Sequence, residues 1–143
     1  ERSGMAATGA ITAFYTVLVE GDDMNEPVAD TVRGVLDGHI VLSRRLAAEN
    51  LYPAIDISPS ISRVMSTIVA PEHLAAAARL RDALATYERH HDLIAIGAYV
   101  PGTSPAIDAA LALYPKIQAF RRQDQAQLEP FAHTVRALDA ATW

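Results

Sequence analysis

A continuous apolar and β-branched run near the N-terminus constrains the fold of this chain more than any other feature. Residues 11–19 read ITAFYTVLV, without alternation between apolar and polar positions. A run of this kind is typical of a strand that other layers cover on both faces, as in a parallel sheet. Such sheets usually hold five or six strands. The rest of the chain offers only about two more candidate strands, so we expect much of the sheet to lie upstream of this sequence.

A short amphipathic helix is predicted after the acidic loop at 20–23. Apolar residues recur at helical spacing from Val28 to Leu36, with Pro27 near the start and Gly38 just past the end. Asp22, Asp23 and Glu26 could be imagined as a general acid and base. Three acids in a turn before a helix are explained more simply by loop solvation and by favourable charge at a helix N-terminus.

Two short β-type runs follow, at 39–42 and 54–57, and the helix-prone segment 43–49 lies between them. This strand–helix–strand pattern continues the α/β character of the first part of the chain. We therefore expect residues 1–70 to form the tail of an α/β sheet domain. Arg44 and Arg45 follow the first of these runs, and we expect them to lie in solvent or in local ion pairs.

The second half of the chain predicts a small helical bundle. From Pro71 onward the composition shifts to Ala, Leu, Arg and Glu, and Leu80, Leu84 and Tyr87 form an apolar stripe. Ser104 followed by Pro105 is typical of a helix start, and Ile117 with Phe120 marks another apolar face. The predicted fold class is α/β plus α, with an α/β unit over 1–70 and a helical unit over 71–143.

Composition and charge exclude several classes of protein. Half of the 143 residues are hydrophobic and 20% are charged, a balance that allows a buried core. No apolar run approaches the roughly 20 residues that cross a bilayer. The absence of cysteine excludes disulfides and thiolate metal sites, and a net charge of −5 with scattered Arg argues against nucleic acid and anionic lipid as partners. Because the chain starts at Glu1 without an initiator Met or a signal pattern, we expect it to be part of a longer protein. The absence of cysteine fits a bacterial cytosolic protein.

Five sequence blocks resemble the ATPases of bacterial type III secretion and flagellar export. They occur in the order and at the spacing of that family: GAITAFYTVL at 9–18, EGDDMNEP at 20–27, DGHIVLSR at 37–44, YPAID at 52–56 and SISRVM at 60–65. The helical half matches more loosely, through IGAY at 96–99 and KIQAFRRQ at 116–123. These ATPases are similar to the catalytic subunits of rotary ATP synthases, with a β-barrel domain, a RecA-like nucleotide-binding domain and a C-terminal helical domain. The resemblance implies that residues 1–70 end the RecA-like domain.

The chain lacks the phosphate-binding motif G-x-x-x-x-G-K-[ST]. In a P-loop ATPase this motif holds the triphosphate through backbone amides and Lys, and its hydroxyl holds Mg²⁺. The resemblance therefore implies a full-length parent that uses ATP and Mg²⁺, with the motif and the acidic Mg²⁺ ligands upstream. We expect no cofactor and no ATPase activity in this chain alone.

The resemblance also assigns candidate site residues. In this enzyme class a neighbouring subunit supplies an Arg that stabilises charge on the γ-phosphate, and the SISRVM block gives that role to Arg63. The alternative is a surface or salt-bridge arginine. Tyr52 matches an aromatic residue that packs on adenine, and Phe120 and Gln123 would close the other side of that pocket. Ordinary packing of a half-buried tyrosine is the alternative for Tyr52.

No metal site and no covalent nucleophile are predicted from the residues. His90 and His91 are adjacent, and adjacent helical positions point about 100° apart, so they do not form a chelating pair. No Ser or Thr lies in a nucleophile elbow, and there is no thiol.

The resemblance implies a homo-hexamer in the cytoplasm, peripheral to the inner-membrane secretion apparatus, that couples ATP hydrolysis to chaperone release, unfolding and export of secreted proteins. The implied partners are stalk and stator-like proteins, chaperone–effector complexes and the export gate, with no nucleic acid. We expect the loop at 97–105 to face the central channel. A rotary ATP synthase-type subunit, or a non-enzymatic helical interaction module, remains the alternative.

Overall fold

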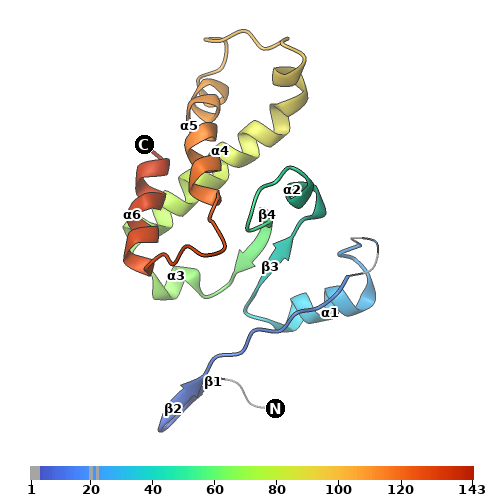
Figure 1. Cartoon of the computed structure of the whole chain (residues 1–143), viewed down its shortest axis with the longest axis vertical. Helices are drawn as coiled ribbons and strands as arrows, with labels where there is room; N and C mark the ends of the chain where they lie inside the picture. The colour runs from blue at the N-terminus through green and yellow to red at the C-terminus, as the bar shows by residue number, and fades with distance from the viewer. Residues whose placement is uncertain (1–3, 20, 22) are drawn as a thin grey trace. The chain divides into compact units, whose positions relative to one another are not determined.

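The computed structural model describes residues 4–19, 21 and 23–143. The chain divides into two compact units, residues 1–36 and residues 37–143, which are described separately below. Figure 1 labels their helices and strands along the chain.

The N-terminal unit begins with a small antiparallel hairpin. Strand β1 (Gly4–Ala6) pairs with β2 (Gly9–Ile11), with Met5 opposite Ala10. Residues 12–19 form neither strand nor helix, and Phe14 and Leu18 are both 91% exposed. The predicted core strand at 11–19 is therefore wrong for this chain. A strand of a parallel sheet needs hydrogen-bonding neighbours and covering layers, and the described residues of this unit supply neither.

Helix α1 (Pro27–Val35) confirms the helix predicted from Pro27 and the valine spacing. The Glu26 carboxylate accepts a hydrogen bond from the Ala29 backbone N–H at 3.1 Å, which caps the helix N-terminus. The Arg33 guanidinium donates to the Met24 carbonyl at 2.8 Å. The structural interpretation of Glu26 is thus confirmed, whereas Glu20 and Asp22 of the same acidic loop lie outside the described residues.

Strands β3 (Gly38–Leu42) and β4 (Ile55–Ser62) form the sheet of the second unit, with α2 (Arg44–Ala48) between them in sequence. Strand β3 and helix α2 lie where the sequence predicts them, whereas β4 starts within the predicted run 54–57 but continues to Ser62. The pattern is typical of parallel α/β sheets, but this pair is antiparallel, with Leu42 opposite Ile55. Because α2 has only five residues and Asn50 turns the chain with a φ of 55°, β4 returns beside β3 in the opposite direction.

The pairing of β3 with β4 is close at Gly38. A Cβ atom placed on Gly38 would lie 2.5 Å from the carbonyl oxygen of Ile61, a backbone atom that cannot rotate away. A register shift interrupts the ladder between His39 and Val41, and the Ser60 hydroxyl accepts a hydrogen bond from the Val41 N–H at 3.0 Å there. The close approach at Gly38 and the hydrogen bond at the register shift thus hold the two strands together at two places.

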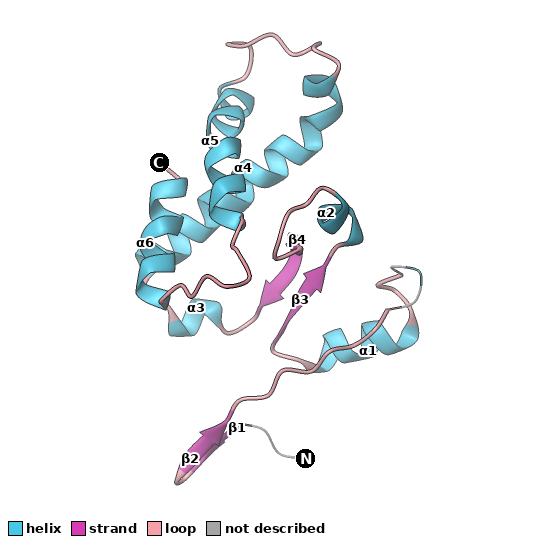
Figure 2. Cartoon of the chain, viewed as in Figure 1, coloured by secondary structure: helices cyan, strands magenta, loops and turns pink. Residues whose placement is uncertain are grey.

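Four helices complete the second unit: α3 (Met65–Ile68), α4 (Pro71–Ala95), α5 (Pro105–Arg121) and α6 (Phe131–Ala141). Figure 2 shows α5 and α6 beside the long helix α4. The helical character predicted for residues 71–143 is therefore confirmed. Within the described residues, no helix combines the length and apolar character that a bilayer crossing requires.

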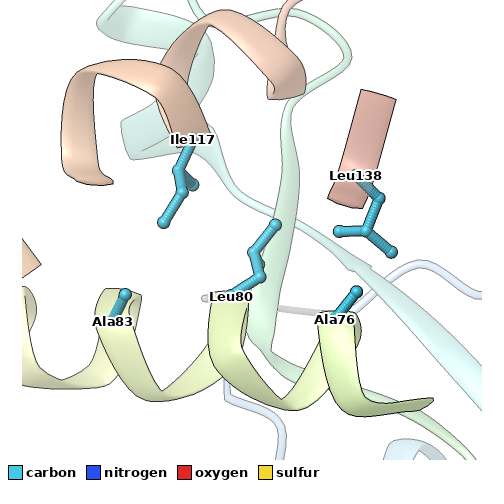
Figure 3. Close-up of a cluster of buried hydrophobic side chains, with 5 residues drawn as sticks. All are labelled: Ala76, Leu80, Ala83, Ile117 and Leu138. Atoms are coloured by element: carbon cyan, nitrogen blue, oxygen red, sulfur yellow. The ribbon is translucent and has the colours of Figure 1, made fainter. Parts of the chain in front are cut away.

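Helices α4, α5 and α6 pack around one apolar cluster (Figure 3), formed by Ala76, Leu80, Ala83, Ile117 and Leu138. Burial of each large side chain of this kind contributes roughly 1.5–3 kcal/mol to stability. The predicted stripe on α4 is confirmed, because Leu80 and Leu84 are both buried and the Tyr87 ring stacks on Tyr114 with 3.5 Å between centroids. Burial of Tyr87, with the neighbouring Tyr114, raises the pKa of its phenol.

The loop between α4 and α5 contains a tight turn. Pro101 and Gly102 occupy its centre, Gly102 has a φ of 89°, and the Thr103 N–H donates to the Val100 carbonyl at 3.3 Å. Helix α5 begins at Pro105 as predicted, but the Ser104 side chain makes no capping hydrogen bond. Instead, the Asp108 carboxylate in the first turn accepts hydrogen bonds from the Gly102 N–H and from the Tyr99 hydroxyl, at 3.0 and 2.9 Å.

Candidate functional site

Tyr52 lies on the turn that leads from α2 into β4. Its side chain is 53% exposed, so part of the ring is available for contact with another molecule. Tyr52 borders an open hollow of about 870 Å³ between this turn and the segment after α5. The lining residues are Asn50, Tyr52, Pro53, Arg122, Gln123, Asp124, Gln125 and Gln127.

The structure brings Gln123 to Tyr52. The Gln123 backbone N–H donates to the Tyr52 carbonyl at 2.9 Å, and both residues line the hollow. The Gln123 side chain bends toward the following turn, where its Nε2 donates to the Gln127 carbonyl at 2.9 Å. Gln123 therefore holds the wall of the hollow together through its backbone and its amide group.

Phe120 occupies a different environment from the one predicted with Tyr52 and Gln123. It is half-buried and packs against the apolar cluster between α4, α5 and α6. It is not among the residues that line the hollow. In this chain its ring belongs to the helical core. The next residue along α5 is the one that reaches the Tyr52 turn.

Arg121 is the residue that reaches the Tyr52 turn, and the sequence did not predict this role. Its guanidinium Nη2 donates to the Ile55 carbonyl at 3.0 Å, across 66 positions of sequence. Nothing in the pattern KIQAFRRQ distinguishes Arg121 from the neighbouring Arg122, which is exposed at the hollow. Only the exact end of α5, at Arg121, decides which of the two turns inward.

Arg63 lies at the other end of β4. It follows Ser62 directly, its backbone N–H donates to the Asp37 carbonyl at 2.8 Å, and its side chain is exposed. The two ends of β4 pair with Gly38 and Leu42, which are four residues apart on β3 and so about 14 Å apart. Arg63 and the Tyr52 hollow are therefore separate sites on one strand.

The chemical character of the hollow is polar but carries few charges. Arg122 and Asp124 are the charged residues in its lining, and both are exposed. The Asp124 carboxylate accepts from the Ala126 N–H at 2.9 Å, as part of the turn that forms one wall. An exposed tyrosine beside exposed polar groups can contact a planar, hydrogen-bonding ring.

The other candidate residues take structural roles. Arg45 forms an exposed ion pair with Glu49 at 2.9 Å, one helical turn away. His90 Nδ1 lies 2.8 Å from the Thr86 carbonyl oxygen, whereas His91 packs edge-on against Tyr87. In the part of the chain that the structure describes, no group of three or more His, Asp or Glu side chains is arranged to hold a metal ion.

Comparison with known proteins assigns both halves of the chain. Residues 1–62 match the model of the ATP synthase alpha/beta family, nucleotide-binding domain. Residues 69–140, half of the chain, match the model described as the T3SS EscN ATPase C-terminal domain.

Two curated relatives extend this match over nearly the whole sequence. The chain is 51% identical over 142 residues to the flagellum-specific ATP synthase of Bacillus subtilis, covering 99% of this chain and 32% of that protein. It is 50% identical over 138 residues to the type 3 secretion system ATPase of Pseudomonas syringae pv. tomato, covering 96% and 31%. The chain thus spans about a third of the length of the relatives it matches.

A solved structure agrees with this assignment. The assembled ATPase EscN from the enteropathogenic E. coli type III secretion system superposes with a TM-score of 0.95 at 46% identity, over 99% of this chain and 34% of that one. EscN has also been solved with its central stalk EscO, with a TM-score of 0.88 and 44% identity over 99% of this chain and 33% of that one. From its family-model matches, its relatives and this fold, the chain belongs to the ATPase family of type III secretion and flagellar export.

Proposed function

We propose that this chain is the C-terminal part of a hexameric ATPase that energises type III protein secretion. The observation that carries the proposal is the match to EscN along 99% of the chain, with a TM-score of 0.95. The work of the full-length protein is ATP hydrolysis coupled to chaperone release, unfolding and export of secreted proteins. The chain itself contributes an adenine contact and an arginine for a neighbouring subunit, while the phosphate-binding loop and the Mg²⁺ ligands lie in the upstream part.

The proposed adenine contact is the exposed face of Tyr52 at the hollow. Stacking of a flat ring on an adenine base is favourable by roughly 0.5–1.5 kcal/mol beyond area burial. Gln123 supports the lining of the hollow through its hydrogen bonds to Tyr52 and Gln127. Phe120 packs against the apolar cluster and does not line the hollow, so any effect that it has on the base would be indirect, through the packing of α5.

Arg63 is proposed as the arginine that acts on the nucleotide of the neighbouring subunit. Its exposed side chain and its separation from the Tyr52 hollow along β4 support this role, since one subunit then contributes to two different sites. EscN has been solved as an assembled ATPase, which supports a homo-hexamer here. The upstream part would also complete a RecA-like domain ending near residue 70 and cover the apolar residues at 12–19, such as Phe14 and Leu18.

The helical unit over 71–143 is proposed as the surface for other proteins of the export apparatus. EscN binds a central stalk, EscO, and the loop at 97–105 is the proposed contact for a stalk-like partner. Stator-like proteins, chaperone–effector complexes and the export gate are further proposed partners, and nucleic acid is not one. We place the full-length protein in the cytoplasm, at the inner-membrane secretion apparatus.

A rotary ATP synthase-type subunit is the second candidate, because residues 1–62 match the family model shared with those enzymes. The helical half favours the secretion branch, since residues 69–140 match the model of the type III secretion domain. A third candidate is a helical interaction module without catalysis, which accounts only for residues 71–143. Hydrolysis of ATP by the purified full-length protein tests the proposal against this last alternative. Activity per subunit should rise steeply with protein concentration as hexamers assemble, and a rate that stays at the buffer control would overturn the proposal.

The loop at 97–105 leads to a prediction about salt. Its sequence GAYVPGTSP carries no charged side chain, and Val100 is 63% exposed. Contact with a stalk-like partner through this loop should therefore be apolar and only weakly dependent on ionic strength. The affinity of the full-length ATPase for the stalk should be measured at low and at physiological salt. The part of the change that this loop causes should be less than about threefold. The prediction would be contradicted if the affinity fell steeply from low to physiological salt in the wild type but not in Val100→Ala. The salt dependence would then come from this loop.

A further inference from the structure

Two hydrogen bonds join the end of α5 to the turn that carries Tyr52. Gln123 N–H donates to the Tyr52 carbonyl at 2.9 Å, and Arg121 Nη2 donates to the Ile55 carbonyl at 3.0 Å. The two carbonyls lie on either side of Pro53. The backbone that carries the Tyr52 ring is thus fixed to α5 at two points, and not only through β4.

An arginine at position 121 is energetically unfavourable if its only role is packing. Its guanidinium is partly buried, and its Nε atom is buried without a hydrogen-bond partner among the described residues. Burial of an unpaired donor on a charged group is unfavourable, and an apolar side chain of similar length would avoid that cost. The one clear gain from arginine here is the hydrogen bond to the Ile55 carbonyl.

We propose that Arg121 is a positioning residue for the nucleotide base. It holds the Tyr52 turn against α5, so that the Tyr52 ring stays at the wall of the hollow where it meets the base. Arg121 does not line the hollow, so it acts through Tyr52 and not by contact with the nucleotide. This inference rests on the proposed function, because it assigns the hollow to the base of ATP.

The test uses the full-length ATPase with Arg121→Met. A base contact made equally in the ground state and the transition state affects KM and leaves kcat unchanged. We expect KM for ATP to rise roughly three- to tenfold, with kcat within about twofold of wild type. The inhibition constant of inorganic tripolyphosphate, which has no base, should stay unchanged. Arg81→Met serves as the matched control, because Arg81 is exposed on α4 and does not line the hollow.

Arg121→Lys separates positioning from packing. A carbonyl oxygen needs only one donor, and a lysine ammonium provides one, so Arg121→Lys should recover most of the affinity lost in Arg121→Met. A packing role would give the opposite order, because methionine fills the apolar surroundings without burying a charge. Hydrogen exchange of the amides at 52–55 should be faster in Arg121→Met than in wild type, and close to wild type in Arg121→Lys.

A double-mutant cycle with Tyr52→Ala completes the test. If Arg121 acts through Tyr52, the double variant should have the KM of Tyr52→Ala alone. Additive effects, an unchanged KM in Arg121→Met, or a parallel rise in the tripolyphosphate constant would each overturn the inference while leaving the proposed function intact. A wild-type protein without ATPase activity would overturn both. If Arg121→Met does not fold, Arg121→Gln, whose side chain is two bonds shorter, takes its place with the same expected outcomes.

Discussion

In the full-length ATPase, replacement of Arg63 by alanine should lower the turnover of ATP by about two orders of magnitude or more. Nucleotide affinity and the fold of the subunit should stay nearly unchanged, because the Arg63 side chain is exposed in this unit. The reason is the charge that develops on the γ-phosphoryl oxygens as the bond to the leaving group breaks. An arginine held across a subunit interface stabilises that charge, and such residues are worth roughly 10³ to 10⁵ in rate in other P-loop enzymes.

Arg63→Lys should fail to restore activity. A guanidinium presents two coplanar donors to a phosphoryl group, whereas an ammonium presents a single point charge on a flexible stem. This expectation is the reverse of the one for Arg121, where a single donor to a carbonyl is sufficient. The same substitution at the two arginines thus distinguishes a transition-state contact from a positioning contact.

Turnover of the Arg63 variants should be measured at a concentration where the wild type is fully hexameric, with Arg81→Ala as the exposed-arginine control. Mixtures of Arg63→Ala with a subunit whose phosphate-binding loop is disabled should recover some activity, because each inactive variant supplies what the other lacks. Turnover near wild type in Arg63→Ala would reject the assignment. A variant that loses its thermal transition would instead favour a structural role for Arg63.

The 143-residue chain by itself should neither hydrolyse ATP nor bind it tightly. Its sequence has no phosphate-binding loop, and no group of three or more acidic or histidine side chains among the described residues is arranged for a metal ion. What remains is the Tyr52 face and the polar wall of an open hollow. A stacking contact supplies roughly 0.5–1.5 kcal/mol beyond area burial, against a cost of association of about 4–15 kcal/mol.

A calorimetric titration of the chain with ATP and Mg²⁺ should therefore give only heats of dilution. Phosphate release should equal that of buffer at every protein concentration. A dissociation constant in the micromolar range, or a rate above buffer, would show that the chain binds the triphosphate by groups other than those proposed here.

The starts of α1 and α5 and the buried side of α4 could be predicted from the sequence because their signals are local. Pro27 and Pro105 each occupy the first turn of the helix they were expected to start, and the Leu80 and Leu84 spacing identified the buried side of α4. The strand at 11–19 failed for the opposite reason. Its composition indicates a covered strand, but strand formation depends on neighbours that this chain does not provide among its described residues.

The candidate site was predictable only in part. Tyr52 and Gln123 were selected through the resemblance, and the structure brings them together at one hollow. Phe120 was selected in the same way, yet it lies in the helical core. The contacts of Arg121 and Gln123 depend on where α5 ends, and a difference of one residue at a helix end turns a side chain by about 100°. Sequence spacing does not fix helix ends that closely.

The close approach of the two strands at Gly38 has a consequence for sequence drift. Position 38 contributes no side chain, yet any replacement for glycine would press a Cβ atom against the Ile61 carbonyl oxygen, 2.5 Å away, and move the end of β4. Arg63 follows that end, and its backbone N–H donates a hydrogen bond to the carbonyl of Asp37, the residue just before β3. Substitutions at position 38 should therefore be poorly tolerated although Gly38 carries no side chain, and a mutational scan should show that position 38 affects the placement of Arg63.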